Sequence, residues 1–261
     1  MITVFSPTYN RKKELRTLIE SLKKQSNLDF EWVVVDDGSS DGTKEYIEEI
    51  KENLPFSVNY RYVENGGKMR AINHGMKMAQ GENFFIVDSD DFLSENAIET
   101  VYKYGNQLPL EMGGMVFRKI NKIDGKVSGK AYPQHSVDST PIDIVYKLGI
   151  IGDKAEVFRT DILKQYPFQV FENEKFVPEA SVWIKIGQKH KLRYIDEGIY
   201  YFEYLPSGYT NSFNRLIRNN PQGFAKYYKE MIGYDIPFKN KLKFLIRLIQ
   251  CKLFILLGGK K

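Results

Sequence analysis

The first hundred residues alternate between short apolar runs and amphipathic stretches. The apolar runs cover residues 2–5, 32–35, 58–63 and 84–87, and the stretch at 15–22 carries apolar side chains every three or four positions. Short apolar runs indicate buried strands, and a period near 3.6 residues indicates a helix. Strands that alternate with helices predict parallel pairing through helical crossovers. We therefore expect an α/β fold with a Rossmann-like, mainly parallel central sheet.

The pattern becomes less regular after about residue 105. Asp124-Gly125, flanked by runs at 113–120 and 126–132, predicts a β-hairpin. Two later runs, at 192–195 and 199–204, are candidates for two further strands. No linker, low-complexity segment or internal repeat interrupts the chain, so we expect one compact domain with two functional halves.

The stretch from Ile236 to Lys261 differs from the rest of the chain in charge. It holds seven basic residues and no acidic one, and subtracting these charges from the net +5 leaves −2 for residues 1–235. Its apolar residues fall near helical spacing: Leu242, Leu245, Ile246, Ile249, Leu253 and Leu256. A basic amphipathic helix of this kind can lie on an anionic membrane surface. The alternative is a helix whose apolar face packs on the catalytic domain or on a partner subunit.

Composition argues against several classes of protein. A hydrophobic fraction of 42% and a charged fraction of 27% indicate a globular chain. The single cysteine, Cys251, rules out an intrachain disulfide, and three histidines without a Cys/His cluster argue against structural zinc. No apolar stretch approaches the roughly 20 residues of a bilayer span, and residues 1–5 do not resemble a signal peptide. We therefore expect a cytoplasmic protein, and no nucleic-acid partner, because the basic charge is confined to the tail.

Three carboxylates follow the apolar run 84–87. Asp88, Asp90 and Asp91 would face the crevice where open α/β sheets bind ligands, if that run is a parallel strand. Negative charges this close repel one another unless a cation neutralises them. Hard oxygen ligands suit Mn²⁺ or Mg²⁺, held by one or two carboxylates and the phosphates of a ligand. The alternative is a surface loop before a helix, with Asp91 or Ser94 near its N-terminus.

Two other strands of the first half also end in polar loops. The run 2–5 is closed by Ser6–Asn10, and the run 32–35 by Asp36 and Asp37 followed by a glycine-rich stretch. Each loop could be an ordinary turn, because Gly, Asp, Ser and Asn are turn formers. All three loops fall at the same edge of the predicted sheet, which favours a nucleotide-binding half.

The polar loops match a known pattern of motifs. The motifs occur in the order Pro7–Arg11, Val35–Thr43, Asn65–Lys68 with Ala71–Asn73, and Val87–Asp91. Together they resemble the family 2 inverting glycosyltransferases of the GT-A fold. The resemblance is strong over residues 1–105 and weaker through about residue 212. It implies a catalytic domain at 1–235, whose first half (1–105) binds the nucleotide-sugar and whose second half (106–235) binds the acceptor, followed by the basic helix at 236–261.

The resemblance also implies roles for residues of the first half. Tyr9 would stack on the base of a nucleotide, and Asp37 would accept its ring N–H; an aromatic face and a carboxylate suit uracil. Asp88 would bind the ribose, and Asp90 would be the main metal ligand, with Asp91 as a second ligand or a helix-start residue. The complete set expected around the donor and the metal is Pro7, Thr8, Tyr9, Asn10, Asp37, Lys68, Arg70, Asp88, Ser89, Asp90 and Asp91.

Transfer of the sugar also requires a general base on the acceptor side. The family carries a carboxylate before a helix of the second half, and the matching position is Glu179. The family more often has Glu-Asp where this chain has Pro178-Glu179, so Glu172 and Glu174 are alternatives. Asp153 could contact either sugar or form a turn. A polar loop with Tyr209, Thr210 and Ser212 could fold over the diphosphate.

We therefore expect a metal-dependent inverting glycosyltransferase that uses Mn²⁺ or Mg²⁺. It would move a sugar from a UDP-sugar to a hydroxyl of a lipid-linked glycan acceptor in surface or capsular polysaccharide synthesis, on the inner face of the membrane. One alternative is a sugar-1-phosphate nucleotidyltransferase, although Ser6–Asn10 lacks the glycine typical of its phosphate loop. The other is a nucleotide- or glycan-binding module without catalysis. The sequence does not identify the sugar, the acceptor or the oligomeric state.

Overall fold

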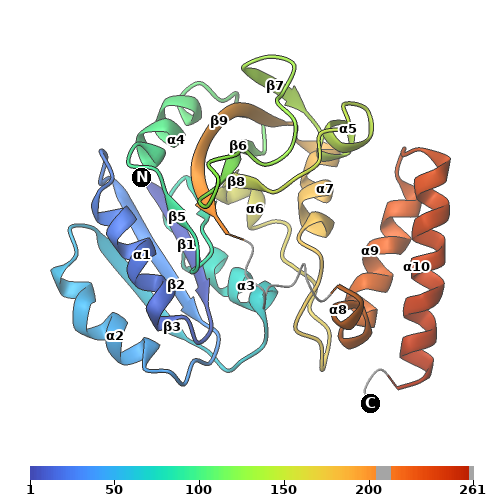
Figure 1. Ribbon diagram of the computed structural model, residues 1–261, viewed down its shortest axis with the longest axis horizontal. Helices are drawn as coiled ribbons and strands as arrows, with labels where there is room; N and C mark the ends of the chain where they lie inside the picture. Colours follow the sequence, from blue (N-terminus) through green and yellow to red (C-terminus); the bar gives the residue numbers. More distant parts are fainter. Residues whose placement is uncertain (204–212, 259–261) are drawn as a thin grey trace.

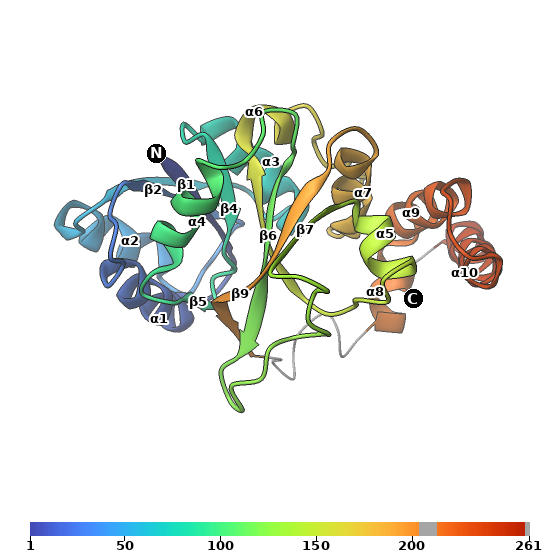
Figure 2. The ribbon, with the colours of Figure 1, turned by 90° about the horizontal axis from the view of Figure 1, so that it is seen from above.

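The computed structural model describes residues 1–203 and 213–258, so Tyr209, Thr210 and Ser212 lie outside the described residues. One nine-stranded sheet runs in the order β3-β2-β1-β4-β8-β6-β9-β5, with β7 paired to β9. The strands are β1 (Ile2–Thr8), β2 (Phe30–Asp36), β3 (Ser57–Tyr62), β4 (Asn83–Ile86), β5 (Phe92–Leu93), β6 (Gly114–Asn121), β7 (Ser136–Ser139), β8 (Lys154–Arg159) and β9 (Leu192–Phe202). Figures 1 and 2 show helices on both faces of this sheet.

The helices complete the alternation that the sequence predicts in its first half. They are α1 (Lys12–Lys23), α2 (Thr43–Ile50), α3 (Lys68–Met78), α4 (Ala97–Gly105), α5 (Pro141–Tyr146), α6 (Thr160–Leu163), α7 (Ala180–Lys189), α8 (Phe213–Asn219), α9 (Pro221–Gly233) and α10 (Phe238–Leu256), with a short 3₁₀ helix at Lys51–Asn53. The predicted α/β fold is confirmed.

The first four strands are parallel, as expected, and the second half of the sheet is mixed. β1 pairs in parallel with both β2 and β4, and β2 pairs in parallel with β3. β8 then joins antiparallel to β4 and to β6, while β9 runs parallel to β6. The carboxyl ends of β1, β2 and β4 therefore meet at one edge, which brings the three polar loops together.

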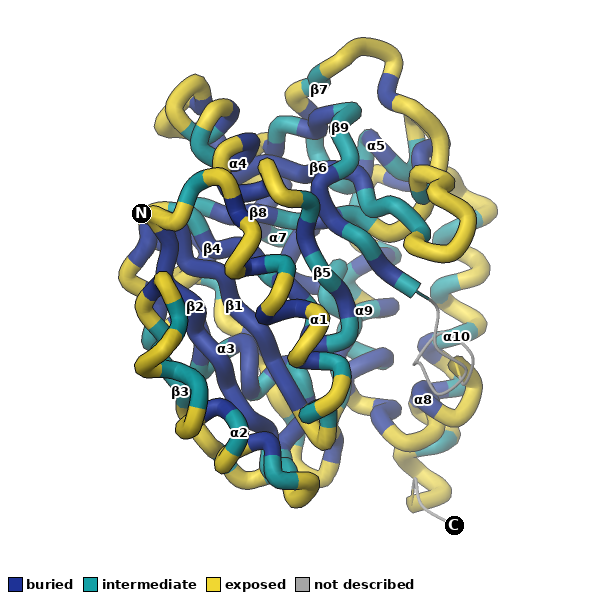
Figure 3. The backbone as a smooth tube through the Cα atoms, turned by 60° about the vertical axis from the view of Figure 1, so that its left-hand side comes forward, coloured by how far each residue is buried: buried dark blue, intermediate teal, exposed yellow. Residues whose placement is uncertain are grey.

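Two cores lie on opposite faces of the sheet. Successive strand residues point to opposite faces, so Val4 joins one core with α1 and α4, and Phe5 joins the other with α3 and α7. Figure 3 shows the central strands buried beneath these helices. Helix α3 comes close to β1 because Gly75 has no side chain: a Cβ there would lie 2.1 Å from the ring of Phe5.

The second half corrects two expectations. The run at 192–195 and residues 199–202 of the later run form one strand, β9, whose pairing with β6 shifts register around Arg118. The turn at Asp124-Gly125 forms a short antiparallel hairpin: Val127 bridges Ile120, and the N–H groups of Asn121 and Ser128 donate to the carbonyls of Lys126 and Lys119. The pairing is shorter than the predicted arm at 126–132, because β8 takes the same side of β6 over residues 114–118.

The predicted C-terminal helix is present as α10 and packs along α9 (Figure 1). Leu248 and Cys251 of α10 are buried against Phe224 and Tyr228 of α9. One apolar face of α10 is therefore packed against the rest of the protein, as expected for the alternative to a membrane-binding helix. Over the described residues, no helix combines the length and apolarity that crossing a bilayer would need.

We predict that Gly75→Ala destabilises the fold by about 1–3 kcal/mol, because an added methyl group overpacks the contact with Phe5. Gly233→Ala is the matched control, since no atom lies within 4 Å of a Cβ at that helical position. Urea unfolding of both variants measures the effect. Equal stability of Gly75→Ala and the unsubstituted protein would show that α3 does not depend on this close approach.

Candidate active site

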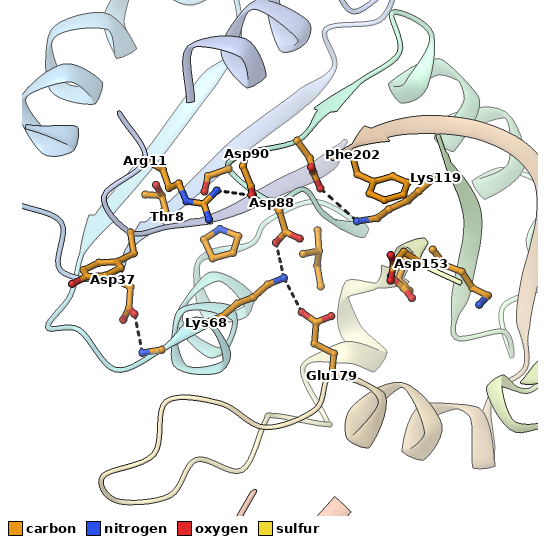
Figure 4. Close-up of a pocket in the computed structure, with 18 of the residues that line it drawn as sticks. Thr8, Arg11, Asp37, Lys68, Asp88, Asp90, Lys119, Asp153, Glu179 and Phe202 are labelled. Atoms are coloured by element: carbon orange, nitrogen blue, oxygen red, sulfur yellow. Dashed lines mark hydrogen bonds and ion pairs between the residues drawn. The ribbon is translucent and has the colours of Figure 1, made fainter. Parts of the chain in front are cut away.

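A cavity of about 780 Å³ lies at the edge where the parallel strands end. Figure 4 shows Asp37 at one end, Lys68, Asp88 and Glu179 in the middle, and Asp153 toward the other end. The cavity therefore combines the loops after β1, β2 and β4 with the start of β8 and of α7.

Lys68, the first residue of α3, joins the two halves of the cavity. Its ammonium lies 2.6 Å from Asp88 Oδ1 and 2.9 Å from Glu179 Oε1. Burial would lower the pKa of Lys68, but Asp88 and Glu179 raise that pKa well above its ordinary value, so the side chain stays charged. Burial would likewise raise the pKa of Asp88, yet Lys68 outweighs it and holds that pKa low. Glu179 thus faces the carboxylates of the first half through one shared cation.

Asp90 is paired with a cation from the neighbouring strand tip. Arg11 Nη1 lies 2.5 Å from Asp90 Oδ2, and both residues line the cavity. Arg11 belongs to the Pro7–Arg11 motif, but the sequence had given it no role of its own. The loops after β1 and β4 are therefore joined by charge as well as by the parallel pairing of their strands.

Asp91 lies deeper than the other two carboxylates. It is buried, and its carboxylate lies 3.7 Å from the ammonium of Lys119 on β6. Burial, with smaller contributions from Asp88 and Asp90, raises the pKa of Asp91 to about 7. Helix α4 begins only at Ala97, so Asp91 is not a helix-start residue.

Asp88 and Asp90 have the right chemistry for a divalent cation. Mg²⁺ and Mn²⁺ take hard oxygen ligands and are commonly held by one or two carboxylates together with phosphate oxygens. Within residues 1–203 and 213–258, the structure contains no group of three or more His, Cys, Asp or Glu side chains arranged around a metal position. Asp88 and Asp90 are paired with Lys68 and Arg11 respectively.

The nucleotide end of the cavity is organised by Asp37. Its two carboxylate oxygens accept the backbone N–H groups of Gly66 at 2.7 Å and Gly67 at 2.8 Å. Gly67 has φ +93°, and a Cβ there would lie 2.0 Å from the carbonyl oxygen of Lys175. Only glycine fits this position, which explains the Gly-Gly pair before α3. Asp37 lines the cavity as expected, and it also fixes the loop that positions Lys68.

Tyr9 offers an aromatic face at this end. Its side chain is 51% exposed and borders the cavity, together with Pro7, Thr8 and Ser89. The buried hydroxyl of Thr8 has no hydrogen-bond partner among the described residues, so it can still bind a ligand. These four residues line the cavity, and their contact with a nucleotide stays a prediction from the motifs.

Two expected binding residues do not line the cavity. The side chain of Asn10 accepts the N–H of Ser40 at 2.8 Å, and its φ of +51° turns the chain toward Arg11. Arg70 donates to the carbonyl of Phe171 at 2.9 Å. Both residues hold loops in place around the cavity, so direct contact with a nucleotide remains only a prediction from the motif.

Glu179 is the one candidate base that reaches the cavity. It lies directly before α7, and its backbone carbonyl accepts the N–H of Val182. Glu174 instead accepts the N–H groups of Gln222 and Gly223 at the start of α9. Glu172 is exposed and lies outside the lining. The geometry therefore favours Glu179 over both alternatives.

Several residues that line the cavity were not predicted as site residues from the sequence. Lys119, Lys154, Glu156 and Trp183 all line the cavity, next to the expected Asp153. Burial lowers the pKa of Lys154, and burial together with Glu179 raises the pKa of Glu156 to about 7. A charged residue inside an apolar strand pattern, as at Lys119 and Glu156, was the available signal.

A family model confirms the resemblance. The model, which describes glycosyl transferase family 2, matches residues 3–148, more than half of the chain. The chain belongs to this family. A Campylobacter jejuni protein, GalNAc(5)-diNAcBac-PP-undecaprenol beta-1,3-glucosyltransferase, is 29% identical over 201 residues, which cover 74% of this chain and 62% of that protein. The Staphylococcus aureus poly(ribitol-phosphate) beta-N-acetylglucosaminyltransferase TarS is 26% identical over 225 residues, covering 80% of this chain and 37% of TarS.

Solved structures share the fold of this family 2 chain. Residues 1–349 of Staphylococcus aureus TarS, in complex with UDP-GlcNAc, superpose with a TM-score of 0.68 at 23% identity over 96% of this chain and 72% of that one. The mannosyltransferase PcManGT from Pyrobaculum calidifontis, in complex with GDP-Man and Mn²⁺, gives a TM-score of 0.62 at 19% identity over 99% and 74%. These likenesses confirm the GT-A fold. The chain spans less than two thirds of the length of the two curated relatives named above.

We predict that the unliganded family 2 chain loses stability between pH 5 and pH 8 through Glu156. In the folded chain the pKa of Glu156 is about 7, above its ordinary value of 4.5. The free energy of unfolding is therefore unaffected by this group below pH 4.5 and falls as the pH rises toward 7. Glu156→Gln removes this loss. The difference in unfolding free energy, variant minus unsubstituted protein, should grow by about 1–3 kcal/mol from pH 5 to pH 8 in urea titrations. A difference that stays constant with pH would contradict the assignment.

Proposed function

We propose that the protein is a metal-dependent inverting glycosyltransferase that moves a sugar from a UDP-sugar to a hydroxyl of a glycan. Family membership supports transfer, and the UDP-GlcNAc complex of TarS supports a uridine diphosphate donor. The observation that carries the proposal is the contact of Lys68 with both Asp88 and Glu179. It unites a carboxylate suited to a sugar nucleotide with a carboxylate suited to an acceptor hydroxyl.

The donor would lie along the strand tips. Tyr9 would stack on the uracil, and Asp37 would accept the ring N–H with oxygen lone pairs left free by Gly66 and Gly67. Asp88 would bind the ribose. Lys68 and Arg11 would attract the negative charge of the diphosphate. Asp90 would hold Mn²⁺ or Mg²⁺, with Asp88 or Asp91 beside it; the bound cation would stabilise the charge that develops on the departing diphosphate.

The transfer is a single displacement. The acceptor oxygen forms a bond to the anomeric carbon, the bond from that carbon to the phosphate oxygen breaks, and UDP leaves. Glu179 takes the proton of the acceptor hydroxyl, whose own pKa is far above neutrality. Attack from the side opposite the leaving group inverts the configuration of the sugar. The ion pair with Lys68 holds the side chain of Glu179 in the cavity.

We predict that Glu179→Gln lowers kcat by about 10²- to 10⁴-fold, the usual contribution of a general base. UDP affinity should change little, because the amide keeps the shape of the side chain. The measurement is UDP release from a UDP-sugar donor with a glycan acceptor, beside calorimetric UDP binding. Glu172→Gln, on an exposed side chain nearby, should stay active. The base would have to be reassigned if the Glu172 variant, and not the Glu179 variant, lost turnover.

The acceptor we propose is a lipid-linked glycan, because the Campylobacter relative is named for an undecaprenol-linked substrate. A lipid-linked acceptor places the enzyme at a membrane surface, and α10 has a face suited to it. Opposite its docked face, α10 exposes a row of apolar side chains, each 44–81% exposed: Leu242, Leu245, Ile246, Ile249, Leu253 and Leu256.

The charges of α10 favour an anionic membrane over a second protein copy. At 100° per residue, Lys241 and Lys252 border the exposed row on one side, and Lys239 and Lys243 on the other. The helix carries no acidic residue. Two such faces packed together would bring like charges into contact, whereas an anionic surface attracts each lysine by about 1 kcal/mol.

We predict that Leu245→Glu/Ile249→Glu weakens binding to phosphatidylglycerol vesicles at least about 10-fold, because two charges enter the apolar row. Leu110→Glu/Ile123→Glu is the matched control, since both residues are exposed apolar side chains far from α10 in the chain. Cosedimentation at low and high salt measures binding, and circular dichroism confirms folding. If the α10 variant changed a dimer into a monomer and left vesicle binding unchanged, the exposed apolar face of α10 would be a protein–protein interface instead.

A further inference from the structure

Glu156 lies in β8 beside the strand that carries the aspartates. In the antiparallel register of β8 and β4, Val157 is opposite Phe85, and Glu156 is the next position toward the carboxyl end of β4. Ala155 and Val157 point into one hydrophobic core. Glu156 points to the opposite face, where it lines the cavity. Its carboxyl group is therefore built into the cavity wall close to the loop of Asp88.

Within the described residues, the one hydrogen-bond donor to this carboxyl group is the backbone N–H of Glu156 itself. Glu156 makes no side-chain hydrogen bond or ion pair with another residue of this part of the chain, in contrast to Asp88, Asp90 and Glu179. Its pKa is raised by burial and by the like charge of Glu179, while Lys119 and Lys154 lower it. A half-buried carboxyl group that faces the cavity with one donor has acceptor capacity left, which the hydroxyl groups of a ligand can use.

The path of the transferred sugar passes this position. In the proposed function, the diphosphate lies near Asp88 and Asp90, and the acceptor hydroxyl lies at Glu179. The sugar joins the two, so its ring must lie between them. Glu156 faces this interval from β8, and Glu179 is close enough to raise its pKa. Asp153, just before β8, also lines the cavity but is more exposed than Glu156.

We propose that Glu156 binds a hydroxyl group of the transferred sugar and thereby determines which UDP-sugar the cavity accepts. The proposal rests on the proposed function. A carboxylate accepts an O–H in a short, charge-assisted hydrogen bond. A site built to bond a hydroxyl rejects a sugar that does not present one there, because the buried carboxyl group is then left unpaired. Glu156 is a specificity-determining residue, distinct from the base Glu179.

The test uses calorimetric titration of the full chain with UDP, UDP-glucose, UDP-galactose, UDP-GlcNAc and UDP-GalNAc in the presence of Mn²⁺. The unsubstituted protein identifies its best donor. Glu156→Gln and Glu156→Ala should bind UDP within about twofold of it, yet lose about 10- to 100-fold in affinity for that donor. Glu49→Gln, on the solvent face of α2, is the matched control and should match the unsubstituted protein with every ligand.

Three results would count against the inference. If both Glu156 variants kept the affinity of the unsubstituted protein for the best donor, this inference would be overturned, and the proposed function would stand. An equal loss for UDP and for the UDP-sugar would also overturn it, because Glu156 would then act on the shape of the cavity. If the unsubstituted protein bound neither UDP nor any UDP-sugar, the proposed function would fail, and this inference with it.

Discussion

The candidate site depends on the position of one ammonium group, that of Lys68. Without it, Asp88 and Glu179 would be two carboxylates in one cavity with no shared cation to pair with. The protein places this cation with a chain of local contacts. Asp37 binds the N–H groups of Gly66 and Gly67, that loop starts α3 at Lys68, and Gly75 lets α3 lie close to β1. The same cation would be the natural partner of an incoming diphosphate, so donor binding and the state of the base are physically coupled.

The sequence predicted that the polar loops of the first half meet at one place, and the reason is physical. In a parallel sheet the ends of neighbouring strands meet at one edge, so polar residues that follow apolar runs converge without any knowledge of long-range contacts. Tyr9, Asp37, Lys68 and Asp88 all follow this rule and line the cavity. Arg70 shows where the rule ends: a residue two positions after Lys68 on a helix points elsewhere, here to the carbonyl of Phe171.

The second half could not be predicted in the same way, because its strands are not joined by helical crossovers. β8 enters the sheet antiparallel between β4 and β6, and this insertion brings Glu156 beside the loop of Asp88. No local pattern specifies such a register. Lys119 on β6 reaches Asp91 for the same reason. The length of the hairpin after Asp124-Gly125 belongs here too: its turn and first cross-strand pair form, but β8 occupies the same side of β6 as far as Arg118 and limits further pairing.

The spacing of apolar residues correctly predicted the last helix, α10, but not what each apolar face of that helix contacts. The residues of α10 contain two apolar faces, and both fall at helical spacing, so the sequence supports docking and surface binding equally. Packing against α9 through Leu248 and Cys251 uses only one of them. Burying the docked face fixes the orientation of the helix, and this necessarily turns the row of Leu245 and Ile249 outward. Docking and membrane binding therefore do not exclude each other in α10. Packing of one face against α9 would present the other apolar face, with the lysines at its borders, to a membrane.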